Sequence, residues 1–440
     1  MKGTAGCYER LREYVESVPL IDSHDHSSKT DRLVYEDPIQ VLVNGRSYFV
    51  SDLCSASTIQ EMEVLADGTL SLDERWPLLE RVWKRTKHTG YAQMIRRVLK
   101  YSYGVEELSL AGLKSMEGRL FDQADEARTE RVLDDAKIVV RLVDCEPWPS
   151  NNQSAKQVLA GTFELCSRAR LVTRLTGYHN LYDAQSIQDN IAPLKRHVTS
   201  LDEYLEGCRE IFEGYKKFGA VAFKDQSAYM RSLEYGNPSR AEAESVFNWL
   251  VEDRYRKVAR PEGAKPLGDF LFHEFMRMAR DMDLPVQIHT GHLGGGGKDV
   301  RNANAAGLTN LIELHRDVRF DLFHANWPYD GEILFLAKSH TNVALNFCWA
   351  NIVDPIYCQR LFKQALSSVP HSKIHGYGSD FGGLPADHAW AHAAIARDNI
   401  AIALSDLVEI DYLGFEDAQE VARSWMFDNA NDYFRLGLAI

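Results

Sequence analysis

Eight short apolar runs, each followed by a stretch of helical periodicity, constrain the fold of this chain more than any other feature. The runs are rich in β-branched residues and occupy residues 18–26, 136–144, 169–177, 220–229, 284–292, 319–327, 342–350 and 373–383. Apolar runs that alternate with helices are typical of buried parallel strands in βαβ units. Eight such units predict an α/β fold whose strands close into a (β/α)8 TIM barrel.

An open doubly wound sheet is the competing fold. That fold usually carries a glycine-rich fingerprint after its first strand, and no such motif follows residues 18–26. Residues 294–297 are consecutive glycines, but they follow the fifth run and lack the G-x-G-x-x-G context of a dinucleotide site. The barrel is therefore the fold that the sequence favours.

The spacing between the first two runs is too long for a bare barrel. Residues 29–135 carry apolar side chains at intervals of three and four residues, and Ser71 followed by Glu74 has the spacing of a capping box. We predict a helical insertion over the barrel mouth, within a single barrel that spans residues 1–440.

The composition excludes several classes of partner. The chain has 63 acidic and 50 basic residues, a net charge of −13, so we expect no nucleic acid partner because an acidic surface repels phosphates. No stretch approaches the roughly 18 apolar residues that span a bilayer, so we expect no membrane partner. The seven cysteines are scattered and form no C-x-x-C pair, which is typical of reduced thiols in a cytoplasmic protein. Whether the chain forms a homo-oligomer is left open.

Metal-ligating side chains recur at the C-terminal ends of the predicted strands. In a barrel these ends converge on one mouth, and imidazole and carboxylate groups are preferred ligands of zinc and similar ions. His24 and His26 are separated by one residue, so on an extended strand they point to the same face. The residues at the strand ends are His24, His26, Lys224, His289, His324 and Asp380.

Each of these residues also has a purely structural explanation. A single histidine such as His289 is often a satisfied core residue, Asp380 could cap a turn, and the stem of Lys224 could extend along the barrel wall. These explanations would all have to apply at strand ends at the same time. The joint pattern therefore predicts a metal centre.

The order of these residues resembles that of the amidohydrolase superfamily of metal-dependent hydrolases. The strings PLIDSHDH, AVAFKDQSAYMRSL, PVQIHTGHLGGG, LFHANWPYDGE, YGSDFGGLP and FDNANDYFRL are similar to the amidohydrolase-2 branch, from about residue 18 to residue 440. Within that branch they resemble the amidohydrolase domain that is found fused to glutamine-synthetase-like proteins. Metal-dependent decarboxylases and uronate isomerases are more distant relatives.

The resemblance implies one or two divalent metals, most often zinc. By analogy His24, His26 and Asp380 hold the first metal, while His289 and His324 hold the second and a carbamylated Lys224 bridges the two. In relatives with a single metal, His289 joins the first metal and His324 serves the substrate or the catalysis. The resemblance also implies that Asp380 is the general base and then the proton donor.

Five further residues are candidates for binding a small-molecule substrate. Tyr229 and Arg231 closely follow Lys224, and an arginine fork suits a carboxylate, although Arg231 could equally lie in a surface loop. His292 and the glycines after it could surround an anionic group with backbone N–H donors or form a mobile loop. Trp327 is either a pocket wall or ordinary packing. Arg174 is either a substrate clamp or a buried charge paired with Asp144.

Residues of the insertion could also close the mouth. Trp83, Lys84 and His88 are the candidates, and the alternative is that they form a solvated helix face.

These features predict a metal-dependent hydrolase. We expect it to activate water for attack on an amide, such as a γ-glutamyl bond, or on a lactone of a small substrate that carries a carboxylate. One alternative is a single-metal lyase, such as a decarboxylase, or a uronate-isomerase-like enzyme, for which the strand-end Lys224 is not needed. A second alternative is a non-catalytic metal-binding scaffold, which the open set of histidines and aspartate disfavours.

Overall fold

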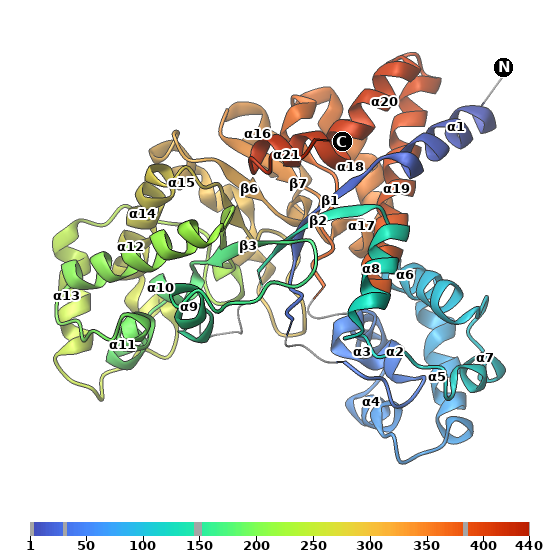
Figure 1. The fold of residues 1–440 in the computed structure, drawn as a ribbon, viewed down its shortest axis with the longest axis horizontal. Helices are drawn as coiled ribbons and strands as arrows, with labels where there is room; N and C mark the ends of the chain where they lie inside the picture. Colours follow the sequence, from blue (N-terminus) through green and yellow to red (C-terminus); the bar gives the residue numbers. More distant parts are fainter. Residues whose placement is uncertain (1–3, 30–32, 145–151, 382–385, 440) are drawn as a thin grey trace.

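The computed structural model describes residues 4–29, 33–144, 152–381 and 386–439. Its strands lie at the centre of the molecule and helices surround them (Figure 1). All eight strands are parallel and hydrogen-bond in sequence order from β1 to β8. They are β1 (Leu20–Asp25), β2 (Ile138–Val143), β3 (Ala169–Arg174), β4 (Ala222–Asp225), β5 (Val286–Ile288), β6 (Phe320–Leu322), β7 (Val343–Asn346) and β8 (Ile374–His375).

The two edge strands of this sheet meet, so the sheet is a nearly closed barrel. The Ser23 N–H donates to the Tyr377 carbonyl over 3.3 Å, and the Asp380 N–H donates to the His24 carbonyl over 2.8 Å. A doubly wound sheet would reverse its strand order at a switch point, and the order here is consecutive. The predicted (β/α)8 barrel is confirmed.

Helices cover the outside of the barrel after each strand. Helix α1 (Thr4–Ser17) precedes β1. The helices after β2 are α9 (Asn152–Leu159), α10 (Thr176–His179), α11 (Ala184–Ile191), α12 (Leu201–Phe218), α13 (Arg240–Val251), α14 (Lys265–Asp281), α15 (Thr309–Leu314), α16 (Asp330–Ser339), α17 (Ala350–Val353), α18 (Pro355–Ser368), α19 (Ala386–Glu409), α20 (Phe415–Arg423) and α21 (Asn429–Tyr433).

The N-terminal end of the barrel is filled by the end of the chain. Phe427 and Phe434 form a buried cluster with early residues of the first four strands, among them Ile21 and Ala222. Closer to the C-terminal ends the interior is polar. There Asp321 accepts hydrogen bonds from the side-chain amides of Gln287 at 3.2 Å and Asn346 at 2.9 Å.

The predicted helical insertion lies between β1 and β2 and forms a lobe at one side of the barrel (Figure 1). The predicted capping box is present, because Ser71 N–H donates to the Glu74 carboxylate at 2.8 Å while Ser71 Oγ accepts from Glu74 N–H at 3.3 Å. The helices are α2 (Gln40–Val43), α3 (Val50–Ser55), α4 (Ile59–Ala66), α5 (Leu72–Thr86), α6 (Gly90–Val98), α7 (Leu110–Met116) and α8 (Glu126–Asp135).

The insertion docks on the barrel through a close approach of two backbones. A Cβ atom at Gly90 would lie 2.2 Å from the carbonyl oxygen of Ile352 in α17, so only glycine fits there. Two ion pairs also connect the insertion to α19, Arg97 with Asp398 at 2.8 Å and Arg128 with Asp387 at 3.3 Å.

None of the described helices has both the length and the apolar character that a membrane crossing requires.

Candidate metal centre

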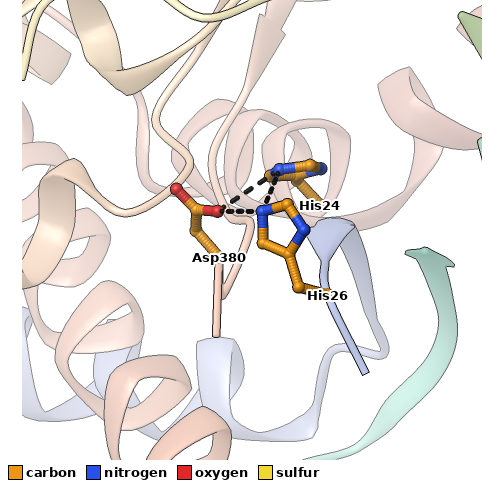
Figure 2. Close-up of side chains that lie close together, drawn as sticks. All are labelled: His24, His26 and Asp380. Carbon is orange, nitrogen blue, oxygen red and sulfur yellow. Dashed lines mark hydrogen bonds and ion pairs between the residues drawn. The ribbon is translucent and has the colours of Figure 1, made fainter. Parts of the chain in front are cut away.

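Three predicted ligands converge where β1 and β8 end (Figure 2). The Nε2 atoms of His24 and His26 are 3.1 Å apart, and they lie 3.3 and 3.0 Å from the same carboxylate oxygen of Asp380. Ligands placed tetrahedrally 2.0–2.1 Å from a zinc ion are about 3.4 Å apart. The three atoms therefore fit around one divalent ion with little rearrangement.

The orientation of His26 leaves its inward nitrogen free to bind a metal. Its Nδ1 is 2.8 Å from the carbonyl oxygen of Asp144, which can only accept a hydrogen bond. The ring proton is therefore on Nδ1, and Nε2 presents a lone pair toward His24 and Asp380. A backbone carbonyl that orients a ligating imidazole in this way is a common feature of metal sites.

His289 and His324 form a second pair of facing imidazoles. The Nε2 of His324 lies 3.0 Å from the Nδ1 of His289. The other nitrogen of each ring is within 2.9 Å of a carbonyl oxygen, that of Cys348 for His324 and that of His292 for His289. Both outer nitrogens are therefore donors, and two lone pairs face each other, which is unfavourable unless a cation or a proton lies between them.

Asp380 connects the two groups of histidines. Its second carboxylate oxygen is 3.6 Å from the Nε2 of His324, while the first faces His24 and His26. All six predicted strand-end residues are buried or half-buried. Five of them, all except Lys224, form one continuous set of nitrogen and oxygen atoms.

The pKa values of these groups follow from their burial and mutual contacts. Burial, together with the charge of Lys224, lowers the pKa of His24 to about 3, and burial lowers that of His324 to about 3. Burial opposes ionisation of Asp380, but the imidazoles around it outweigh that effect and hold the pKa of Asp380 well below its usual range. Burial works against His26 too, yet its contact with Asp380 raises the pKa of His26.

Lys224, the penultimate residue of β4, is fully buried beside this set. Its Nζ lies 3.6 Å from the centre of the Phe323 ring and has no hydrogen-bond partner among the described residues. Burial lowers the pKa of Lys224 to about 8, so a minor neutral fraction is present near neutral pH. A neutral amine is the form that can react with carbon dioxide to give a carbamate.

Cys348 is a candidate ligand that the sequence interpretation missed. Its thiol, the imidazole of His324 and the carboxylate of Asp380 lie within 4.8 Å of one another. Burial raises the pKa of the Cys348 thiol well above its ordinary value. Cys348 belongs to no C-x-x-C pair, and the available signal was its position two residues after the strand that ends at Asn346.

A cavity of about 640 Å³ opens onto these groups. Its size suits a small-molecule ligand. The residues that line it are His26, Tyr48, Arg174, Tyr182, Gln226, Tyr229, Met230, His289, Gly294, Lys298, Trp349 and Asp380. The cavity, the two histidine pairs and Asp380 form one site at the barrel mouth.

Two of the five predicted substrate-binding residues line this cavity. The Tyr229 ring packs against His289 with 4.7 Å between ring centres, and its hydroxyl accepts from Gly294 N–H over 3.1 Å. Arg174 lines the cavity and also pairs with Asp144 through two contacts, at 3.0 and 3.2 Å. The paired-charge interpretation of Arg174 therefore holds, and its guanidinium still borders the cavity.

Of the other predicted substrate-binding residues, Arg231, His292 and Trp327 are not among those that line the cavity, and their roles stay predictions. Arg231 is buried and forms an ion pair with Asp269 of α14. The indole N–H of Trp327 donates to Asp354 at 3.3 Å. The ring of His292 packs against that of Trp349, with 4.6 Å between ring centres. These side chains support the wall and do not form its surface.

The aromatic wall of the cavity comes from Trp349 and from Tyr48 of the insertion. The two ring centres are 4.6 Å apart, and the Tyr48 hydroxyl donates to the backbone carbonyl of Asp380. Of the insertion residues considered from the sequence, Trp83 is buried within the lobe against Phe49, and Lys84 and His88 are exposed. Nothing in the periodicity of the insertion distinguished Tyr48 from its neighbours.

Unusual backbone conformations cluster around the cavity. His324, Trp349, Asp380 and Tyr48 all have positive φ angles, of 61°, 59°, 54° and 57°. Such angles are disfavoured for residues other than glycine and are concentrated at functional sites. This local strain marks the same end of the barrel as the histidines.

Residues 256–436 match the family model of amidohydrolases. This range contains β5 to β8, with His289, His324 and Asp380, whereas His24, His26 and Lys224 lie before it. Protein fluG of Emericella nidulans is 26% identical over 228 residues, which cover 49% of this chain and 26% of that protein. The aligned region is thus only about a quarter of the length of that curated relative.

Two solved structures share the fold over nearly the whole chain. Glucuronate isomerase from Caulobacter crescentus has a TM-score of 0.77 at 18% identity, covering 100% of this chain and 96% of that one. Uronate isomerase from Thermotoga maritima has a TM-score of 0.75 at 16% identity, covering 97% of each chain. At these identities the likeness concerns the fold and not the reaction.

Proposed function

Starting from the confirmed resemblance to the amidohydrolase superfamily, we propose that this chain is a metal-dependent hydrolase. One observation carries the proposal. Two pairs of imidazole nitrogens face each other at 3.1 and 3.0 Å, and the carboxylate of Asp380 lies between the pairs. A buried arrangement of imidazole lone pairs and one carboxylate, rather than the all-cysteine set of a structural site, suits a catalytic divalent ion.

The donor atoms suit zinc at two positions. His24, His26 and Asp380 would hold the first ion. His289 and His324 would hold the second, with the carbamate of Lys224 or the thiolate of Cys348 as a further ligand. A divalent ion bound here would supply hydroxide at neutral pH and polarise a carbonyl group.

Asp380 has the chemistry of the proton carrier. The His24, His26 and His324 imidazoles keep it ionised, so its carboxylate can accept the proton of a water molecule. Its second oxygen, which faces His324, could then return that proton to the leaving group. The backbone of Asp380 is held by hydrogen bonds to His24 and Tyr48, which keeps the carboxylate in place.

The cavity suits a small substrate with a carboxylate. Arg174 and Lys298 supply positive charge at its wall, Gln226 supplies an amide, and Tyr48, Tyr229 and Trp349 supply flat apolar surfaces. An amide such as a γ-glutamyl bond, or a lactone, is the substrate class that we propose.

A single-metal lyase or uronate-isomerase-like enzyme is the second candidate. The observation that favours it is that 3.0 Å between His289 and His324 is also a hydrogen-bond distance. If a proton and not an ion lies between these rings, the pair would act as an acid–base group beside one metal. A non-catalytic scaffold is less consistent with a large cavity that opens directly onto the candidate ligands.

Metal stoichiometry separates these candidates. With zinc and bicarbonate, the hydrolase proposal expects about two zinc ions per chain by elemental analysis, and about one for Lys224→Ala. Lys373→Ala is the matched control, since burial also lowers the pKa of Lys373 to about 8 while its ammonium bonds the His340 carbonyl at 2.6 Å, away from the cavity. Binding of two zinc ions by Lys224→Ala would rule out the carbamate of Lys224 as a metal ligand. Binding of one ion by the wild type would favour the lyase.

The first ion is tested by His24→Ala, which should lose zinc and activity together. Its secondary structure should persist, because the parallel strand ladder and the apolar residues packed between strands and helices do not depend on the metal. Retention of a full zinc load would exclude His24 as a ligand.

A further inference from the structure

A second cavity of about 320 Å³ adjoins the one at the metal centre. The two share the wall residues Tyr182, Tyr229, Met230 and Lys298, so they lie side by side as an inner and an outer compartment. The remaining walls of the outer compartment are Ala259, Arg260, Pro261, Gly297, Asp299 and Asn302. It lies beside the barrel mouth and contains none of the candidate metal ligands.

Tyr229 stands at the boundary between the two compartments. Its ring centre is 4.7 Å from that of His289 on the metal side and 5.7 Å from the Nζ of Lys298. The distance from Lys298 Nζ to the His289 ring therefore cannot exceed the sum of these two values. Tyr182, whose hydroxyl contacts the Met230 sulfur at 3.1 Å, completes this boundary. One small molecule can therefore reach from the metal centre to Lys298.

The charge of the outer compartment is positive. Lys298 and Arg260 border it, and neither has a carboxylate within ion-pair distance among the described residues. Its one acidic wall residue, Asp299, is neutralised by Arg301 at 2.7 Å. In contrast, the arginine of the inner compartment, Arg174, is already paired with Asp144. The outer compartment thus has cations that remain available to a ligand.

The walls between these cations and the metal centre suit a spacer. Met230, Tyr182 and Tyr229 present apolar or aromatic surface along the shared boundary. Burying a short aliphatic chain against such surface is favourable, because it removes apolar surface from water. A ligand that is polar at both ends and apolar between them matches this sequence of surfaces.

We infer that the substrate has two anchored ends, a scissile carbonyl at the metal centre and an anionic group, carboxylate or phosphate, held by Lys298 and Arg260 in the outer compartment. This inference rests on the proposed hydrolase function and specifies its substrate class. The anionic group lies on the part of the substrate that is distal to the reacting bond. The outer compartment then selects substrates by length as well as by charge.

Calorimetric titration of the zinc-loaded full-length protein tests the inference. The probes are linear dicarboxylates from succinate to suberate, each compared with the monocarboxylate of equal length. At one spacer length the dicarboxylate should bind about tenfold more tightly, the effect of one charge-assisted hydrogen bond. The gain should shrink at high ionic strength, since both cations are exposed. A phosphonate in place of the distal carboxylate shows which anion the compartment prefers.

Arg260→Ala is the most specific variant, because Arg260 borders the outer compartment only. It should remove most of the gain of the dicarboxylate and change the affinity for the monocarboxylate by less than twofold. Lys257→Ala is the matched control, since it removes an exposed positive charge three residues away that lines neither compartment, and it should preserve the gain.

The results of these titrations distinguish failure of the outer anion site from failure of the proposed hydrolase function. Equal affinity of both probes at every length, with zinc-dependent binding of the monocarboxylates, would overturn the outer anion site and leave the metal centre in place. A gain that survives Arg260→Ala combined with Lys298→Ala would also overturn it. If no probe binds in a zinc-dependent way, the proposed metal function fails and this inference fails with it.

Discussion

The strand ends of the barrel and the helical insertion border the same cavity, but they hold their side chains there by different means. Five strand-end groups, from His24 to Asp380, lie 3.0–3.6 Å from their neighbours. The parallel hydrogen-bonded ladder of the barrel fixes their relative positions. The insertion reaches the cavity with Tyr48, whose place depends on ring packing against Trp349 and on one hydrogen bond to Asp380.

The difference indicates a division of roles. A ladder of backbone hydrogen bonds sets positions to within fractions of an ångström, as metal ligation requires. Docking of a separate lobe through side chains is less restrictive, and it suits a wall that shapes the cavity. We therefore expect changes in the strand ends to affect the reaction itself, and changes in the insertion to affect ligand affinity and stability.

The largest effect should come from Asp380→Asn. The amide keeps the size of the side chain and one oxygen ligand but cannot accept a proton, so turnover should fall by roughly 10²- to 10⁴-fold. Zinc content should fall only in part. The measurement is steady-state kinetics on a substrate found by screening amides and lactones, together with metal analysis. A variant that keeps full turnover and a full zinc load would exclude Asp380 as the proton carrier.

Acid should destabilise the metal-free barrel. His24, His324 and His392 have pKa values lowered to about 3 by burial, and His292 to about 4, so the folded state does not take up the protons that unfolded histidines bind below about pH 6.5. Each such group removes about 1.4 kcal/mol of stability per pH unit as the pH falls. Buried Asp22, with a pKa raised to about 8, and His26, whose pKa is raised by contact with Asp380, act in the opposite direction.

We therefore expect the free energy of unfolding to drop by several kcal/mol between pH 6.5 and 5, as measured by urea denaturation. His88→Ala should show the same pH dependence, because this histidine of the insertion is exposed. A flat profile over this interval would contradict the buried neutral histidines.

Gly90→Ala should loosen the docking of the insertion. The added Cβ would lie 2.2 Å from the Ile352 carbonyl and 2.8 Å from Pro355, so backbone must shift, at a cost of about 1–3 kcal/mol. Thermal denaturation should show a lower midpoint, and ligand affinity should fall while zinc content is kept. Gly68→Ala, a glycine of the same insertion with open space around it, is the control. Equal midpoints for both variants would argue against the tight contact.

Tyr48→Phe should have a moderate effect on ligand binding. It removes only the hydroxyl that donates to the Asp380 carbonyl, and a net hydrogen bond contributes about 0.5–1.5 kcal/mol, or roughly 2- to 12-fold in KM. Zinc content should stay at the wild-type value. Tyr101→Phe removes an insertion hydroxyl that instead contacts Asp135 at 2.5 Å on an exposed side, and it should leave KM unchanged. A loss of zinc in Tyr48→Phe would mean that the insertion also positions the metal ligands.

The smallest effect should come from Lys84→Ala and His88→Ala. Both side chains are exposed on the insertion and neither lines the cavity, so KM and zinc content should stay within about twofold of wild type. A larger change in KM would place this face of the insertion over the cavity.

Much of the fold and part of the site could be predicted from the sequence. The eight strands, the insertion and the capping box at Ser71 follow from local patterns of side chains, and all are present. The strand-end residues His24, His26, His289, His324 and Asp380 do meet, because a parallel barrel brings the C-terminal ends of its strands together. The predicted residues that do not line the cavity, Arg231, His292 and Trp327, lie beyond the strand ends.

By itself the sequence determined which side chains the barrel would gather, since the alternation of strands and helices sets the topology and the topology sets which ends converge. Only the tertiary structure decided the rest. Arg231 lies close to Lys224 in the chain, yet it pairs with Asp269 of α14 and not with the cavity. Tyr48 reaches the site because packing of the insertion against Trp349 carries it there. The hydrogen-bonded ladder follows a local periodicity that can be read along the chain, whereas loop and lobe contacts depend on the shapes of surfaces that exist only once the chain has folded.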